Sequence, residues 1–276
     1  MQVDSHIDWL SVTAKQSHGS ALHQATLGAH ESVRAVNHYD TAKKYPSGML
    51  VLSHSKRVDM GEHIIYSGKT LEALSQDVTR AELIAYHVSS GHNVSRVDIA
   101  IDLLDSGVTV AAIKIADENK QISTRAIQRS YVKETGVRQG EGYYIGNMRK
   151  RKKLLRCYDK ALEQKHIGTD WLRLELACAG TAARGAGKML AADCSHERMV
   201  AMINGFTQID IPALKVALSA QPTKIPLSYK SDYEASLIAA FKTIPAWIAG
   251  LQAQCDWDVL DAIVTRTKAL MDQQIH

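Results

Sequence analysis

Apolar and polar residues alternate along several segments of the chain, which is the pattern of β-strands that bury one face. The first such segment is HIDWLSVT at residues 6–13. Two more, MLVLSH at 49–54 and HIIYSG at 63–68, follow a Tyr-Pro-Ser-Gly turn at 45–48. These segments predict the first strands of a sheet.

The most regular alternation is in RVDIAIDLLD at residues 96–105. Successive residues of a strand point to opposite faces, so this segment predicts one aliphatic face and one polar face. The polar face carries Arg96, Asp98, Ala100 and Asp102, and the aliphatic face carries Val97, Ile99, Ile101 and Leu103. We expect the aliphatic face to lie in the core and the polar face to carry solvent or chemistry.

Three later segments continue the sheet. GYYIGN at 142–147 and LLRCYDK at 154–160 flank a run of five cations, so together they predict a β-hairpin with a cationic tip. WLRLELA at 171–177 alternates again and places Arg173 and Glu175 on one face.

The remaining segments indicate helices. Residues 70–91 and 108–130 have apolar residues at helical spacing. An Ala/Gly-rich stretch at 179–188 is the best candidate linker, and helical composition broken by prolines follows it. We therefore expect an α+β first domain over residues 1–180, with a central, mainly antiparallel sheet and helices packed on one side, and a helical C-terminal region over residues 195–276.

Composition is that of a globular protein, with 45% hydrophobic and 22% charged residues. No segment approaches the ~18 uncharged apolar residues of a membrane span. The N-terminal segment lacks the basic and then apolar pattern of a secretory signal, which favours a cytoplasmic location. The cysteines, Cys157, Cys178, Cys194 and Cys255, are widely spaced, which argues against a zinc site and a disulfide framework.

The distribution of charge is more informative than its total. A net charge of +4 is weak evidence for a polyanionic partner. The predicted hairpin tip, however, consists of five consecutive cations, Arg149, Lys150, Arg151, Lys152 and Lys153. Such a run suits a DNA backbone, although most basic runs are solvated loops.

The strand after the basic run predicts a row of chemically useful side chains. Arg156, Tyr158 and Lys160 alternate along it, roughly 6 to 7 Å apart on one face. A tyrosine hydroxyl that attacks a phosphodiester needs cations to stabilise the developing charge, and usually a divalent metal on oxygen ligands. The row and nearby carboxylates therefore predict a phosphoryl-transfer site that uses Mg²⁺ or Mn²⁺.

The predicted metal ligands lie on two other strands. Asp98 and Asp102 are separated by about 13 Å in an extended strand, too far to bind one ion easily. We therefore expect one of them to share the metal with Glu175, while the other orients a cation or a water.

Each of these residues also has a purely structural interpretation. A tyrosine flanked by charges on a strand is more often a packing residue than a nucleophile. Asp98 and Asp102 would then form cross-strand ion pairs with Arg156 or Arg173. GAGKM at 185–189 resembles a phosphate-binding loop, but it lacks the upstream glycine and the Ser or Thr that holds magnesium, so we reject that motif.

In combination, the motifs resemble those of the replication initiation factors of rolling-circle plasmids and filamentous phages, the Rep_trans family. The matching stretches run in the family's order between residues 7 and 180: DWLSVT, MGEHIIYSGKTLEAL, SRVDIAIDLLD, GYYIGN, LLRCYDKALE and WLRLELACAG. Each stretch is short, and their order makes the combination specific. The chain departs from the family after Gly146, where many relatives continue with Ser-Arg and this chain has NMRKRKK.

The resemblance implies a nicking enzyme. Members of the family cut the leading strand of an origin, link a tyrosine to the 5′ phosphate and leave a 3′ hydroxyl that primes replication. The family's nucleophile matches Tyr158 here, while Tyr144, on the neighbouring strand of the hairpin, is a less favoured alternative. The other matching positions are Arg156, Lys160 and Glu163 around the tyrosine, and Asp98, Asp102 and Glu175 in connection with the metal.

We therefore expect a rolling-circle replication initiator, a metal-dependent tyrosine nickase and joining enzyme. The implied partners are origin DNA that is single-stranded or folded as a hairpin at the nick, a host helicase and a second copy of the chain. Two alternatives stay open. A relaxase of a mobile element would use the same chemistry, and a non-catalytic DNA-binding protein would use the carboxylates only to pair with arginines.

Overall fold

The computed structural model describes residues 1–14, 29–57, 60–75, 78–134, 140–148, 152–166 and 168–227. The chain divides into two compact units, residues 1–228 and residues 229–276, and all described residues belong to the first. The predicted C-terminal helical region lies outside the described residues after residue 227. The predicted domain boundary between residues 180 and 195 stays a prediction.

Within the described residues, ten strands form one sheet in the order β2-β3-β4-β5-β1-β6-β11-β10-β9-β8, and all neighbours are antiparallel. These strands are β1 (Gln2–Ala14), β2 (Glu31–Ser32), β3 (Thr41–Lys44), β4 (Leu50–Ser53), β5 (Glu62–Tyr66), β6 (Asn93–Leu104), β8 (Arg129–Glu134), β9 (Gly140–Gly146), β10 (Lys153–Asp159) and β11 (Trp171–Ala179). A separate pair is formed by β7 (Ile122–Thr124) and β12 (Thr207–Ile209). The centre of the large sheet is thus built from β1, β6, β11 and β10.

The helices are α2 (Gly68–Leu74), α3 (Arg80–Ser89), α4 (Val110–Glu118), α5 (Lys160–Gln164), α6 (Thr181–Ala192) and α7 (His196–Phe206), followed by a 3₁₀ turn at Pro212–Leu214. The predicted helix over residues 70–91 is divided into α2 and α3. The division falls before Thr79, whose extended backbone and reciprocal hydrogen bonds with Glu82 form a capping box that starts α3. No helix in the described ranges is long and apolar enough to cross a membrane.

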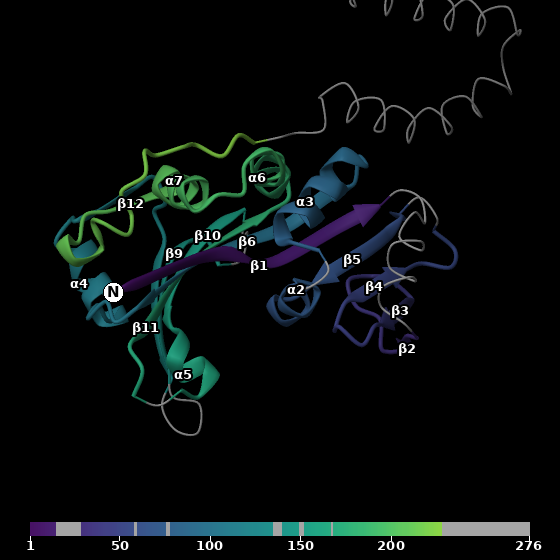
Figure 1. Cartoon of the computed structure of the whole chain (residues 1–276), viewed down its shortest axis with the longest axis horizontal. Helices are drawn as coiled ribbons and strands as arrows, with labels where there is room; N and C mark the ends of the chain where they lie inside the picture. The colour runs from purple at the N-terminus through teal and green to yellow at the C-terminus, as the bar shows by residue number, and fades with distance from the viewer. Residues whose placement is uncertain are drawn as a thin grey trace, which may run out of the picture. The chain divides into compact units, whose positions relative to one another are not determined.

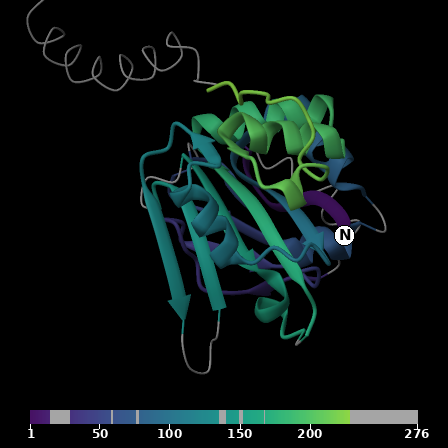
Figure 2. The ribbon, with the colours of Figure 1, turned by 90° about the vertical axis from the view of Figure 1, so that its left-hand side faces the viewer.

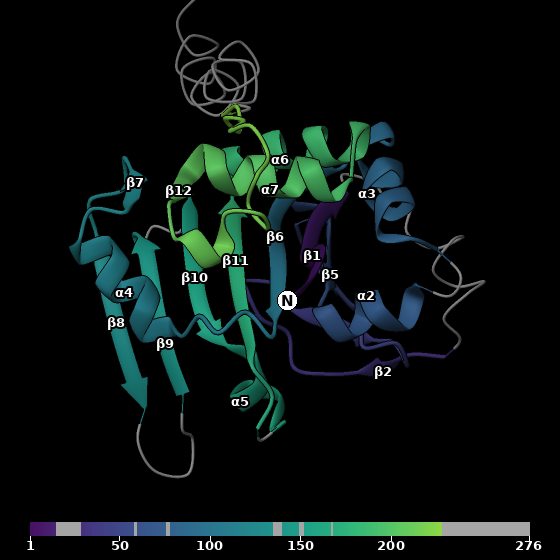
Figure 3. The same ribbon diagram turned by 60° about the vertical axis from the view of Figure 1, so that its left-hand side comes forward.

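Helices α3, α4, α6 and α7 pack on one face of the sheet (Figure 1 and Figure 3). That face carries aliphatic side chains of β6 and β11, including Ile99 and Leu174, which form one core with Ala186 of α6 and Met202 of α7. The opposite face carries the polar residues of the same strands. The predicted fold class, an antiparallel sheet with helices packed on one side, is confirmed.

The predicted linker at residues 179–188 is wrong, because most of it forms α6. Its small residues allow close packing instead of flexibility. A Cβ at Gly185 would lie 1.8 Å from the backbone oxygen of Pro226, and one at Gly187 would lie 2.8 Å from a methyl of Val94. Residues 210–227 run back across α6 and α7, as Figure 2 shows. The backbone of this segment can approach α6 closely because Gly185 has no side chain.

Two other predictions have mixed outcomes. The helix predicted over residues 108–130 ends early, since α4 stops at Glu118, Lys120 has a left-handed backbone (φ 60°), and β7 and β8 follow. The hairpin of β9 and β10 is confirmed by their antiparallel pairing. Three of its predicted tip residues, Arg149, Lys150 and Arg151, lie outside the described residues.

Candidate functional site

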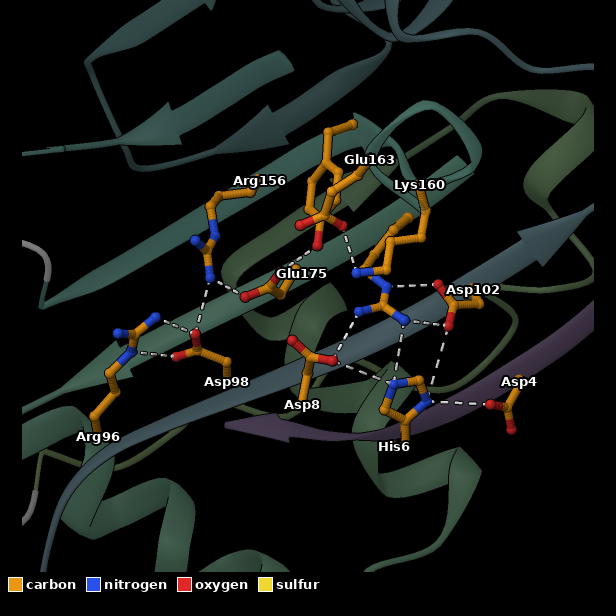
Figure 4. A network of polar contacts seen from close by, with 12 residues as sticks. Asp4, His6, Asp8, Arg96, Asp98, Asp102, Arg156, Lys160, Glu163 and Glu175 are labelled. Atoms are coloured by element: carbon orange, nitrogen blue, oxygen red, sulfur yellow. Dashed lines mark hydrogen bonds and ion pairs between the residues drawn. The ribbon is translucent and has the colours of Figure 1, made fainter. Parts of the chain in front are cut away.

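The polar face of the sheet is organised in two rows that cross β10, β11, β6 and β1. Each row consists of residues directly opposite one another on neighbouring strands, whose side chains therefore lie about 4.5 to 5.5 Å apart at Cβ. The first row is Tyr158, Arg173, Asp102 and Asp4, and the second is Arg156, Glu175, Ala100 and His6. The strand register alone therefore brings a tyrosine, two arginines and several carboxylates together. Figure 4 shows Arg156, Glu175 and Asp102 on this face.

Tyr158 is hydrogen-bonded to a carboxylate. Its hydroxyl donates to Oε2 of Glu175 at 2.8 Å, and the other oxygen of Glu175 pairs with Nη2 of Arg156. Glu175 is 2% exposed, whereas Tyr158 is half-buried and the Arg156 side chain is 28% exposed. Burial raises the pKa of Tyr158 well above its ordinary value, against the opposing charge of Arg173. The hydroxyl is therefore protonated at neutral pH.

Asp98 lies between two arginines and does not reach Asp102. Nη2 of Arg156 donates to Oδ2 of Asp98 at 2.8 Å, and Arg96 forms two bonds with the same carboxylate, at 2.5 and 3.0 Å. The guanidinium carbon of Arg96 also lies 4.5 Å from the centre of the Trp9 ring. Asp98, only 1% exposed, is thus held by cations that reach the surface.

Arg173 is the centre of a second cluster. Its Nε and Nη2 each donate to one oxygen of Asp102 at 2.6 Å, and its Nη1 donates to Asp8 at 2.8 Å. Asp8 lies at a bulge of β1 between Ile7 and Trp9. Burial alone would raise the pKa of Asp8, but the hydrogen bond from His6 and the charge of Arg173 hold it far below its usual value.

Lys160 ends the row that was predicted on β10, as the first residue of α5. Asp159 caps that helix by accepting a bond from the amide of Leu162 at 2.9 Å. The Lys160 side chain is nearly buried, forms an ion pair with Glu163, and places Nζ 5.8 Å from the centre of the Tyr158 ring. A cation thus lies beside Tyr158, as predicted.

Tyr144 lies on the same face as Tyr158, one strand away. It is directly opposite Arg156, and its ring covers Gly142, which is itself opposite Tyr158. A Cβ at Gly142 would lie 2.9 Å from the Tyr144 hydroxyl. The glycine therefore leaves room for the Tyr144 ring beside Tyr158, and no carboxylate on the described residues accepts a bond from the Tyr144 hydroxyl.

A group of residues that could hold a metal lies at the other end of the first row. Single ligand atoms of Asp4, His6 and Asp102 all lie within 4.8 Å of one another. Oxygen and imidazole donors suit Mn²⁺, and two carboxylates with one imidazole leave positions for water or a phosphate. His6 Nε2 lies 3.7 Å from Asp8, a neighbour of the kind that orients a ligating imidazole.

The structure thus divides the predicted metal ligands. Asp102 is in the group with Asp4 and His6, whereas Asp98 and Glu175 are both bound to Arg156. Their assignment as ligands stays a prediction. The ion pairs of the structural interpretation are present, since Asp98 pairs with Arg156 and Asp102 with Arg173.

Sequence reasoning missed the contribution of β1. Asp4, His6 and Asp8 alternate in the segment DSHID, the same signal that identified the polar face of β6, but the segment was interpreted only as a strand. Of the predicted basic residues, Lys152 is exposed and Lys153 donates to the carbonyl of Ile225 at 3.2 Å. The predicted DNA contacts of both stay a prediction.

Comparison with known proteins gives two matches. Residues 92–212 match the model of the Rep_trans family, replication initiation factor. The fold is similar to a solved structure of the rolling circle replication initiator protein from Geobacillus stearothermophilus, with a TM-score of 0.67 and 15% identity over 83% of this chain and 100% of that chain. No curated protein matches the sequence. The resemblance seen in the sequence motifs is thus confirmed.

Proposed function

From the match of residues 92–212 to the replication initiation factors, we propose that this chain initiates rolling-circle replication by nicking one strand of origin DNA with Tyr158. The observation that carries the proposal is the position of Tyr158. Its hydroxyl donates a hydrogen bond to the carboxylate of Glu175. The side chains of Arg156, Arg173 and Lys160 lie near it. The solved initiator with a similar fold supports the same function.

The proposed reaction is a transesterification. The Tyr158 oxygen forms a bond to the scissile phosphorus, and the bond from phosphorus to the 3′ oxygen of the preceding nucleotide breaks. Arg156 and Lys160 stabilise the negative charge that develops on the phosphate oxygens. The phosphodiester is kept as a phosphotyrosine, so the reverse reaction rejoins the strand without a nucleotide cofactor.

The proposed metal would be held by Asp4, His6 and Asp102. A divalent ion, when bound, polarises a phosphate and lowers the cost of its developing charge. Arg173 fixes the orientation of Asp102 through two hydrogen bonds and also contacts Asp8.

The substrate is proposed to be single-stranded or hairpin DNA at the nick. A half-buried tyrosine on a sheet surface needs a phosphate that can approach it closely, which a melted strand allows more readily than a duplex. A helicase and a second copy of the chain are further proposed partners.

The ion pairs favour one alternative, a non-catalytic DNA-binding protein in which the carboxylates only pair with arginines. One experiment separates the two. Wild-type protein is incubated with Mn²⁺ and a random-sequence, single-stranded oligonucleotide pool labelled at the 3′ end, and then denatured. A labelled protein band that maps to Tyr158 is expected, whereas DNA binding without such an adduct would establish the alternative.

A relaxase of a mobile element would form the same adduct, so the distinction from an initiator needs a second assay. A plasmid that lacks its own initiator gene, and carries the sequence cut in the oligonucleotide pool, is supplied with this chain. Replication of the plasmid is expected for an initiator.

A further inference from the structure

Nucleophilic attack by Tyr158 requires that its proton be removed. Burial raises the pKa of this phenol, so at neutral pH the hydroxyl loses its proton only to a nearby acceptor. A positioned carboxylate that accepts a proton in the transition state contributes roughly a hundredfold to ten-thousandfold to such a rate.

We propose that Glu175 is the general base of the nicking step, and the general acid when the strand is rejoined. The proposal rests on the nicking function proposed above and assigns Glu175 a different role from the metal ligand predicted from the sequence.

The hydrogen bond between Tyr158 and Glu175 has the geometry of a proton transfer. The Tyr158 hydroxyl donates to Oε2 of Glu175 at 2.8 Å, within the range needed for direct proton transfer. Other carboxylates near Tyr158, such as Glu163 and Asp8, act on it through charge. Among the described residues, no carboxylate other than Glu175 accepts a bond from this hydroxyl.

Glu175 is itself held in place by Arg156. Its Oε1 pairs with Nη2 of Arg156, which leaves Oε2 for the tyrosine. The carboxylate is 2% exposed, so water does not compete for Oε2. Because Arg156 also binds Asp98, the guanidinium is fixed from two sides and keeps Glu175 oriented.

Both carboxylate oxygens of Glu175 already have partners. A metal bound to Glu175 would have to displace either the Arg156 pair or the Tyr158 hydroxyl. Glu175 is also not a member of the group Asp4, His6 and Asp102, whose ligand atoms lie within 4.8 Å of one another. Proton transfer therefore fits the observed contacts of Glu175 better than metal binding.

The proposed step is balanced in atoms and charge. The phenolic proton moves from Tyr158 to Oε2 of Glu175 while the phenolic oxygen forms its bond to phosphorus. The electron pair of the broken bond leaves with the 3′ oxygen, which takes a proton from water. In rejoining, a 3′ hydroxyl attacks the phosphotyrosine, its proton returns to water, and protonated Glu175 gives its proton back to the Tyr158 oxygen.

The test compares Glu175→Gln with a matched control, Asp98→Asn. Each variant replaces a buried carboxylate that accepts a bond from Nη2 of Arg156 by an amide. Of the two carboxylates, only Glu175 is bonded to Tyr158. Each is made with ordinary tyrosine and with 3,5-difluorotyrosine at position 158, whose phenol ionises much more readily. The rate of labelled adduct formation is measured with the 3′-labelled single-stranded pool and Mn²⁺.

Glu175→Gln is expected to slow adduct formation roughly 100- to 10,000-fold, and difluorotyrosine to restore much of that loss. Any loss in Asp98→Asn is expected to be unaffected by difluorotyrosine, because the base is still present. Should Glu175→Gln not fold, Glu175→Asp keeps the charge but withdraws the carboxylate by one methylene, and the same loss and rescue are expected.

The result that overturns the inference is a folded Glu175→Gln protein that forms the Tyr158 adduct at the wild-type rate, or a loss that difluorotyrosine does not relieve. Neither result affects the proposed nicking function. That function fails separately if wild-type protein forms no adduct at Tyr158.

Discussion

Arg173 and Asp102 lie 71 residues apart in the sequence and directly opposite each other on β11 and β6. They form a pair with two parallel hydrogen bonds of 2.6 Å, in which both side chains are 4% exposed. Such a pair is geometrically specific, and it depends on both members because either charge alone would be buried without compensation.

Replacing Arg173 by Met should therefore destabilise the fold. The substitution leaves the buried Asp102 without its two hydrogen bonds and removes one of the partners of Asp8, which costs about 3 to 5 kcal/mol. Lys215→Met is the control, because the Lys215–Asp210 pair is 3.8 Å long and each side chain is 77% exposed. Urea denaturation at pH 7 should show the difference. Equal midpoints for the two variants would contradict the importance of the buried pair.

The two tyrosines of the polar face should differ sharply in function. Tyr158→Phe removes the hydroxyl that is bonded to Glu175 and should lower covalent adduct formation by more than roughly a thousandfold. Tyr144→Phe keeps the ring that covers Gly142 and should retain the adduct. Denaturing gels of the labelled reaction measure both. An adduct that persists in Tyr158→Phe and disappears in Tyr144→Phe would show that Tyr144 is the nucleophile instead of Tyr158.

The metal group on β1 and β6 can be tested by binding alone. His6→Ala removes one of three ligands and should weaken Mn²⁺ binding at least about tenfold, as measured by calorimetry. His196→Ala is the matched control. His196 of α7 contacts Ser5, which is on the same strand as His6, at 2.9 Å, but His196 is not a member of the metal group. Equal Mn²⁺ affinity of the two variants would remove His6 from the site.

Two buried cysteines predict a loss of stability at alkaline pH. Burial raises the pKa of Cys157 and Cys178 to about 12, whereas a thiol of the unfolded chain ionises near pH 8.5. The unfolded state therefore binds fewer protons between these values. Stability is fully present below about pH 8.5 and falls as the pH rises towards 12.

The same burial should protect these thiols from reagents. In a Cys255→Ser background, native protein at pH 8 should react with a thiol reagent at the half-buried Cys194, and at Cys157 and Cys178 only after unfolding in urea. Mass spectrometry of the labelled peptides identifies the sites. Fast native labelling of Cys157 or Cys178 would show that the strands carrying them open readily.

The close packing of α6 predicts that one methyl group added at Gly185 destabilises the fold. In Gly185→Ala the new Cβ would overlap the backbone oxygen of Pro226, so the segment that crosses α6 must move, which costs about 1 to 3 kcal/mol. Gly140→Ala is the control, because its Cβ would meet no atom within 4 Å. Thermal unfolding should show a lower midpoint for Gly185→Ala only. A midpoint equal to that of the control would mean that the segment is free to shift.

The sequence predicted those parts of the site that depend on local alternation. The alternation of β6 placed Asp98 and Asp102 on one face, and in the structure the two carboxylates pair with different arginines, Arg156 and Arg173. The pattern of β10 likewise placed Arg156 and Tyr158 together. Both results follow from the period of a single strand, which needs no knowledge of its neighbours.

The features that the sequence did not predict depend on contacts between segments far apart in the chain. The alternation of β1 places Asp8 on the polar face, but its contact with Arg173 depends on the pairing of β1 with β6, which the isolated sequence of β1 does not reveal. The prediction of a linker at residues 179–188 was wrong for a similar reason. The glycines of α6 lower its intrinsic helix propensity, and only its contacts with Val94 and Pro226 show why they are there.

The order of strands in the sheet also constrains how the chain can be synthesised. β6 lies between β1, which a ribosome makes before it, and β11, which it makes later. At roughly 5 to 20 residues per second, the 71 residues from Asp102 to Arg173 take about 4 to 14 s to appear. During that time a nascent chain that has already paired β1 with β6 carries an exposed strand edge and a carboxylate without its arginine. A chaperone that binds such edges should therefore associate with ribosomes that have translated β6 but not yet β11.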